Sequence, residues 1–142
     1  MCKVERLENI ITVDCGKKLP TIKTFERIID EIYEDPYTEY DYYEIRLYVP
    51  NMPYVTDCED FEFLILETLE DLYCNNPIHY EVEESIDERI EYEIMLEGLK
   101  IESKKYLPNG QILYTIKMFV RHEVVGFTQY DADAFMLHHL GL

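Results

Sequence analysis

The first third of the chain changes from a strand pattern to a helix pattern and back. Apolar and β-branched residues fill Leu7–Val13, and the residues Asp14–Gly16 that follow are typical of a turn. From Thr21, apolar side chains recur every three or four residues, the spacing of one helix face, until Asp35–Pro36 interrupts it. Alternation returns in Glu44–Val49. We therefore expect a strand, a helix and a second strand.

A second amphipathic helix is predicted over Asp57–Tyr73. Thr56 stands three residues before Glu59, so its hydroxyl can accept a hydrogen bond from a free N–H of the first turn while the carboxylate reaches back. Asn75–Pro77 closes the helix, and the alternating run Ile78–Val82 predicts another strand.

The second half of the chain is dominated by strand patterns. Residues 85–97 fit two interpretations, because a further capping pattern favours a helix whereas period-two apolar positions favour a strand; we adopt the strand. Leu99–Tyr106 and Ile112–Arg121 flank Asn109–Gly110, a residue pair that suits a tight hairpin turn. Glu123–Tyr130 would then add a third adjacent strand.

Together these elements predict a single α+β domain over residues 1–142. Two amphipathic helices would pack on a mostly antiparallel sheet, which would end in a β-meander. A short terminal helix capped by Asp131 would follow. The length of 142 residues suits one domain and suffices to bury a hydrophobic core.

Acidic residues are concentrated in one part of the chain. Thirty Asp and Glu stand against 13 Lys and Arg, which gives a formal net charge of −17. The segment 26–97 holds 23 of these acids and only three bases, whereas the segment 98–142 is near neutral. Like charges at this density repel one another and destabilise a compact state. The acids either cover outer surfaces for solubility or form a surface for a basic partner.

The composition also excludes several classes of protein. Direct binding to nucleic acid or to an anionic membrane surface is disfavoured, because phosphate attraction needs positive charge. No apolar run approaches the roughly 20 residues of a membrane span, and Met1–Asn9 has no signal-peptide pattern. Cys2, Cys15, Cys58 and Cys74 lack the spacing of a zinc site. We expect reduced thiols and a cytoplasmic protein.

Carboxylates recur at every second position in two of the predicted strands. Residues two apart on a strand share a face and lie about 6.6 to 6.8 Å apart, and neighbouring strands lie about 4.8 Å apart. Such a face would carry negative charge at a density similar to that of a nucleic acid. The residues predicted to form it are Glu81 and Glu83 on the first strand and Glu91, Glu93 and Glu97 on the second.

Tyrosine is abundant, with 13 residues against no tryptophan. Its ring supplies contact area and its hydroxyl a hydrogen bond, so it is enriched at protein interfaces. Between the first helix and the second predicted strand, tyrosines alternate with acids and predict an exposed binding edge. This edge comprises Tyr37, Glu39, Tyr40, Asp41 and Tyr42. Ordinary packing in the core and sheet is the alternative for each tyrosine.

Motifs for catalysis are absent from the sequence: it has no phosphate-binding glycine loop and no nucleophile elbow. The set best suited to a metal ion is His122, Asp131, Asp133, His138 and His139. The last two are neighbours that would point about 100° apart on a helix, so one ion could not easily take both. We predict no catalytic residue, no metal and no cofactor. A small metal-dependent enzyme or nuclease toxin using these residues is the alternative.

These observations favour a noncatalytic acidic interaction protein. It would bind and block the nucleic-acid-binding surface of a basic partner, such as a nuclease. In general character it resembles the small acidic inhibitors, including anti-CRISPR and anti-restriction proteins, that phages deploy against host-defence nucleases. No residue motif carries this resemblance, so it implies no fold and no site. An oligomeric adaptor or structural protein, for instance a homodimer, is the remaining alternative.

Overall fold

The computed structural model describes residues 2–34, 40–75, 77–85 and 88–128. The six strands form one sheet in the order β1-β2-β3-β6-β5-β4, in which β2 and β3 are parallel and the other neighbours antiparallel. Along the chain the elements are β1 (Lys3–Leu7), β2 (Ile10–Asp14), α1 (Ile22–Tyr33), β3 (Tyr42–Pro50), α2 (Glu59–Asn75), β4 (Ile78–Glu83), β5 (Arg89–Tyr106) and β6 (Gln111–Thr128).

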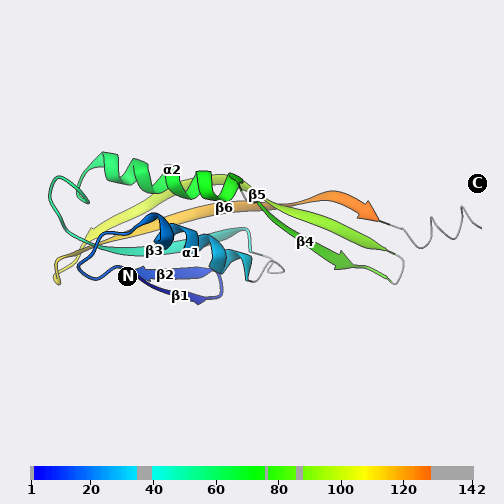
Figure 1. The fold of residues 1–142 in the computed structure, drawn as a ribbon, viewed down its shortest axis with the longest axis horizontal. Coiled ribbons are helices and arrows are strands. Elements are labelled where there is room, and N and C mark those ends of the chain that lie inside the picture. Colours follow the sequence, from blue (N-terminus) through cyan, green and yellow to red (C-terminus); the bar gives the residue numbers. More distant parts are fainter. Residues whose placement is uncertain (1, 35–39, 76, 86–87, 129–142) are drawn as a thin grey trace, which may run out of the picture.

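The sheet curls into a half-barrel, and both helices pack on the same face of it (Figure 1). Helix α2 contacts β5, helix α1 contacts β1 and β2, and the two helices contact each other. The hydrophobic core lies between the helices and this face. Its fully buried strand residues include Ile11, Val13, Tyr43, Ile45, Leu47, Val49, Ile94, Ile112, Tyr114, Ile116 and Met118.

The predicted fold, with two amphipathic helices on a mostly antiparallel sheet that ends in a β-meander, is wrong. Strands make up 51% of the structure, and the curled sheet is mixed. Period-two alternation continues beyond Arg121 with no turn signal, so the predicted third strand is the continuation of β6 to Thr128. Strands β5 and β6 each run for 18 residues and meet at the predicted Asn109–Gly110 turn. The helix predicted from Asp131 lies outside the described residues.

The N-terminal strand prediction merged two strands into one. Strand β1 ends at Leu7 and β2 begins at Ile10, and Glu8 between them has a left-handed backbone conformation with φ of 55°. This turn contains no glycine, so the sequence pattern gave no sign of the break. Helix α1 then crosses from β2 to the parallel strand β3, as a parallel pair requires.

Both predicted helices are present, but they begin differently. Helix α1 follows Thr21, whose N–H donates to the Thr24 hydroxyl at 3.1 Å. Helix α2 begins at Glu59, and the capping role predicted for Thr56 is wrong. Thr56 precedes the helix in the chain, and its side chain is buried. Its hydroxyl accepts a hydrogen bond from the Met52 N–H and donates one to the Pro50 carbonyl. It therefore stabilises the loop after β3.

The prediction of four reduced thiols is wrong for one pair, because Cys2 and Cys15 form a disulfide. Lys3 and Asp14 are opposite each other in the β1–β2 ladder, so the two cysteines are the next pair across the same hairpin. Their sequence spacing gave no signal, since β1 itself was not predicted. Cys58 and Cys74 are free thiols.

One end of the sheet extends beyond the helices (Figure 1). The pairing of β3 with β6 ends at Tyr42 and Phe119, and further along β6 pairs with β5 alone. We call β4, together with residues Arg89–Ile94 of β5 and His122–Thr128 of β6, the arm; the other elements form the body. The arm is thus a three-stranded ribbon attached to the helix-covered body.

Candidate functional site

The outer face of the arm, which points away from the helices, carries a patch of carboxylates. In the register of β4 and β5, Glu81 lies directly opposite Glu91, and His79 lies opposite Glu93. Glu93 in turn lies opposite Glu123 of β6. Since residues paired across a ladder share a face, these side chains project on the same side of the sheet. We call Glu81, Glu83, Glu91, Glu93 and Glu123 the carboxylate face.

Only part of this negative charge is balanced within the protein. Arg89 forms an ion pair with Glu83 at 3.4 Å, and Arg121 forms one with Glu123 at 2.5 Å. Within the described ranges, Glu81, Glu91 and Glu93 have no ion pair with a lysine or arginine. Side chains directly opposite each other are about 4.5 to 5.5 Å apart at Cβ, so like charges there destabilise the ladder. A cationic partner would relieve this repulsion.

The Glu91 carboxylate lies against Gly126 of the neighbouring strand, in space that a larger residue would fill. A Cβ added at Gly126 would approach the Glu91 Oε2 to 2.6 Å. Together with His79 and Tyr80, the carboxylates of Glu81 and Glu91 border a hollow of about 560 Å³. Two of the three unbalanced carboxylates, Glu81 and Glu91, therefore border a concave region of the surface.

Two of the acids differ from the sequence prediction. The ladder of β5 and β6 shifts register between Leu96 and Gly98, so Glu97 lies at a bulge outside the row, where Arg121 pairs with it at 3.1 Å. Glu123 joins the row although it was not predicted. Alternation that continues from β6 into Glu123 is the sequence signal for this position, whereas a separate third strand over Glu123–Tyr130 implies a turn that the structure does not have.

The predicted tyrosine edge is only partly described, since Tyr37 and Glu39 lie outside the described residues. Tyr40 is half-buried and packs edge to face on Tyr43, with ring centroids 6.3 Å apart. Asp41 is exposed. Tyr42 is 37% exposed, and the Lys117 ammonium lies 4.9 Å from its ring centroid. These residues lie where the arm joins the body and are not part of the carboxylate face.

His122 links the arm to this junction on the inner face. Its Nε2 lies 3.4 Å from the Tyr40 carbonyl oxygen, which can only accept, so Nε2 carries the proton. Nδ1 then accepts from the Tyr80 hydroxyl at 2.8 Å. Burial, and to a lesser degree neighbouring Tyr92, raises the pKa of Tyr80 and keeps that donor protonated.

Of the five residues considered for a metal site, only His122 lies among the described residues, and its side chain makes other contacts. Both ring nitrogens of His122 take part in the contacts above, while Asp131, Asp133, His138 and His139 lie outside the described residues. In the part of the chain that the structure describes, no three His, Cys, Asp or Glu residues form a group that could hold a metal ion.

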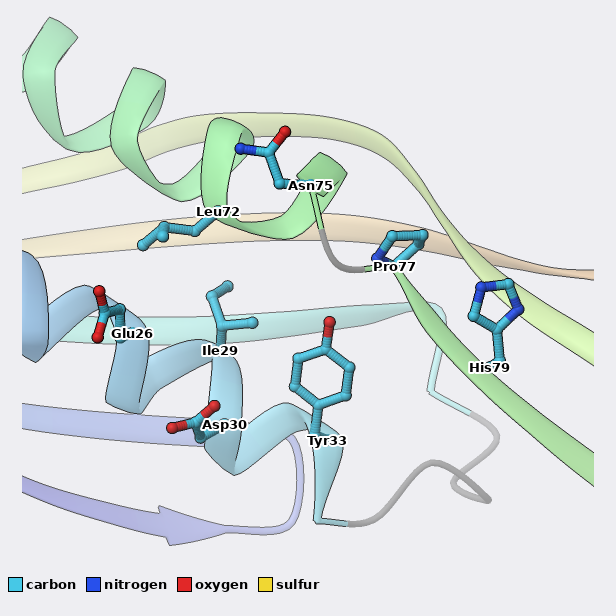
Figure 2. A pocket seen from close by; sticks show the side chains of 8 residues that line it. All are labelled: Glu26, Ile29, Asp30, Tyr33, Leu72, Asn75, Pro77 and His79. Carbon is cyan, nitrogen blue, oxygen red and sulfur yellow. The ribbon is translucent and has the colours of Figure 1, made fainter.

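A second hollow, of about 560 Å³, opens between the C-terminal ends of the two helices and the start of β4 (Figure 2). Helix α1 contributes four residues at helical spacing, α2 contributes two, and the β4 side contributes two. They are Glu26, Ile29, Asp30, Tyr33, Leu72, Asn75, Pro77 and His79. His79 also borders the hollow on the carboxylate face, so the two concave regions adjoin.

Comparison with protein-family models, with curated proteins and with solved structures finds no match to this chain. No helix among the described residues has the length and apolar character needed to cross a membrane.

Proposed function

We propose that this chain is a noncatalytic acidic interaction protein whose arm binds the nucleic-acid-binding surface of a basic partner. The observation that carries this proposal is the unbalanced pair of Glu81 and Glu91, directly opposite each other on an uncovered ribbon. A pairing that destabilises the free protein becomes favourable when arginine or lysine side chains reach it.

The dimensions of the face support this type of partner. Carboxylates two apart along β4 and β5 repeat at about 6.6 to 6.8 Å, and rows on adjacent strands are about 4.8 Å apart. Basic side chains arranged for phosphates can meet such a lattice with charge-assisted hydrogen bonds. The net charge of −17 would also accelerate encounter with a basic surface.

The proposed partner class is a basic nucleic-acid enzyme, of which a host-defence nuclease is one example. The proposed compartment is the cytoplasm, because such enzymes meet their substrates there; the Cys2–Cys15 disulfide removes reduced thiols as a ground for this proposal. Binding would compete with DNA or RNA for the same surface and would weaken as salt rises, because exposed charges are screened beyond about 8 to 10 Å near physiological ionic strength.

Capture from nuclease-treated lysate, followed by release with added DNA or RNA, tests this proposal. The immobilised wild type should retain a basic protein that the nucleic acid releases. Glu81→Lys combined with Glu91→Lys should reduce its capture at least about tenfold, because two attractive contacts become repulsive.

The matched control is Glu67→Lys combined with Glu70→Lys, which makes the same charge change at exposed positions of α2. It should capture the partner nearly as well as the wild type. Equal capture by the folded arm variant and the control, or a captured protein that nucleic acid does not release, would refute the proposal. Far-UV circular dichroism establishes that both variants are folded.

A further inference from the structure

The hollow between the helix ends has the electrostatic character of a cation site. Glu26 and Asp30 of α1 line it, and Tyr33 and Asn75, the last residues of α1 and α2, bring two helix C-termini to it. Helix C-termini carry partial negative charge, and neither last turn contains a basic residue to offset it. Within the described residues, Glu26 and Asp30 have no ion pair. The hollow therefore presents negative potential without an internal counterion.

A buried hydroxyl without a partner lies at the same place. The Tyr33 Oη is fully buried and has no hydrogen-bond partner among the described residues. Burial, and secondly the charge of Asp30, raises the pKa of this hydroxyl. In Figure 2 the hydroxyl points from the end of α1 toward the end of α2 and the start of β4. Buried polar groups nearly always have a partner, so this one indicates a missing hydrogen-bonding group.

The remaining walls are apolar. Ile29, Leu72 and Pro77 line the hollow beside the polar groups. An aliphatic chain that ends in a cation fits this division, because its stem would cover the apolar walls while its head group meets the carboxylates. Arginine and lysine side chains have this construction, with the charged group at the end of an apolar stem.

We propose that this hollow binds an alkylguanidinium or alkylammonium group, supplied by an arginine or lysine side chain of the basic partner. The partner as source of the cation rests on the proposed function, whereas the cation site itself does not. His79 of the edge strand β4 borders both this hollow and the one at Glu81 and Glu91, so the two sites adjoin at that edge and one partner that reaches around it can contact both. Arginine anchors in concave sites are common energetic centres of protein interfaces.

Titration with n-butylguanidinium, followed through the backbone amide resonances of Leu72, Asn75 and His79, tests the cation site. We expect saturable shifts with a Kd on the order of 1 mM, as for a fragment of this size. N-butylurea, which has a similar shape and no charge, should bind at least tenfold more weakly. No saturable shift with the cation, or equal affinity for the urea, would overturn the inference.

Variants then identify the groups responsible. Glu26→Gln with Asp30→Asn should weaken butylguanidinium binding at least tenfold, and Tyr33→Phe about threefold. Removing two like charges four residues apart should not destabilise α1, so lost binding would not reflect unfolding. Glu67→Gln with Glu70→Gln makes the same charge change on α2 and should bind as the wild type. Wild-type affinity in the Glu26 and Asp30 double variant would overturn the inference.

The capture assay separates this inference from the proposed function. Butylguanidinium binding without any captured basic partner would remove the proposed function and leave the cation site. If a captured partner binds the Glu26→Gln and Asp30→Asn variant as tightly as the wild type, the proposed function stands. The partner's side chain then does not occupy this hollow. A partner bound at least tenfold more weakly by that variant would support both.

Discussion

The body and the arm use the same strands in different surroundings. In the body, side chains on the inner face of β3 and β6 are fully buried beneath the helices. In the arm, the inner side of β6 has no helix over it, and Val124 and Phe127 are 59% and 56% exposed. The body therefore supplies most of the buried core, while the arm supplies exposed surface.

This separation explains how the chain tolerates its acidic surface. Charges that faced one another beneath the helices would require desolvation, whereas Glu81 and Glu91 remain in contact with water. The repulsion between them is correspondingly small. Binding residues can therefore be collected on the arm at little cost to the folding of the body.

Truncating equivalent residues in the two regions gives the largest expected effect. Ile116→Ala, between Ile45 and Ile101 in the body, should lower the free energy of unfolding by about 2–5 kcal/mol. Ile90→Ala in the arm should cost less than half as much, because Ile90 is only half-buried. Urea denaturation measures both. Equal losses would contradict the division into body and arm.

The disulfide should stabilise the far edge of the body. The bond between Cys2 and Cys15, which are 13 positions apart, restricts the unfolded chain, so Cys2→Ser with Cys15→Ser should lower the free energy of unfolding by up to about 3 kcal/mol. Urea curves with and without reductant provide the measurement. Cys58→Ser with Cys74→Ser is the matched control. This variant keeps the disulfide, so reductant should still lower its free energy of unfolding. The Cys2→Ser and Cys15→Ser variant should capture the basic partner as well as the wild type does.

Alkaline pH should weaken the body through Tyr114. Burial raises its pKa to about 12, with Lys104 acting in the opposite direction, and its hydroxyl donates to the Thr56 carbonyl at 2.6 Å. Between pH 10 and 12 the unfolded chain loses this proton while the folded chain keeps it, so stability falls as pH rises.

Tyr114→Phe should make the decline in unfolding free energy between pH 10 and 12 shallower, although the variant is less stable at neutral pH because it lacks the hydrogen bond. Denaturation at several pH values provides the test. Tyr54→Phe, at a 96% exposed position, is the control and should leave the slope unchanged. An unchanged slope in Tyr114→Phe would contradict the assigned cause.

A charge reversal on the arm should have the smallest effect on stability. Glu81→Lys turns a repulsive pair with Glu91 into an attractive one and should raise the free energy of unfolding by about 0.2–1 kcal/mol while weakening partner capture. Glu67→Lys on α2, which likewise relieves repulsion with Glu70 and Asp71 one helical turn away, should also raise stability slightly but should leave partner capture unchanged. A less stable Glu81→Lys protein would show that the opposed carboxylates do not repel.

The local elements were predictable where periodicity and turn chemistry agreed. The apolar stripe of α1, the alternation in β3 and the Asn109–Gly110 turn all appear in the structure. The turn at Glu8 has no glycine, and the bulges of β5 interrupt period-two alternation, so neither gave a usable signal. Sheet order was not predictable, because it depends on contacts between segments distant in sequence.

The candidate site was predictable only in part for the same reason. Alternation correctly grouped Glu81 and Glu83, and likewise Glu91 and Glu93, on one face of each strand. Which strands were neighbours, and that Glu123 completes the row, required the tertiary fold. The hollow at Tyr33 brings together two helix ends and a strand, which no local pattern specifies.

The long β5–β6 hairpin also implies an order of folding. Tyr106 pairs with Ile112 beside the turn, whereas Arg89 pairs with Thr128 at the far end of the ladder. Loop-closure entropy increases with chain separation, so pairing should start at the turn and proceed outward. Pulse-labelling hydrogen exchange should find amides near the turn protected before those near Thr128. The arm then forms last, so a partly refolded chain contains the folded body but not yet the carboxylate face.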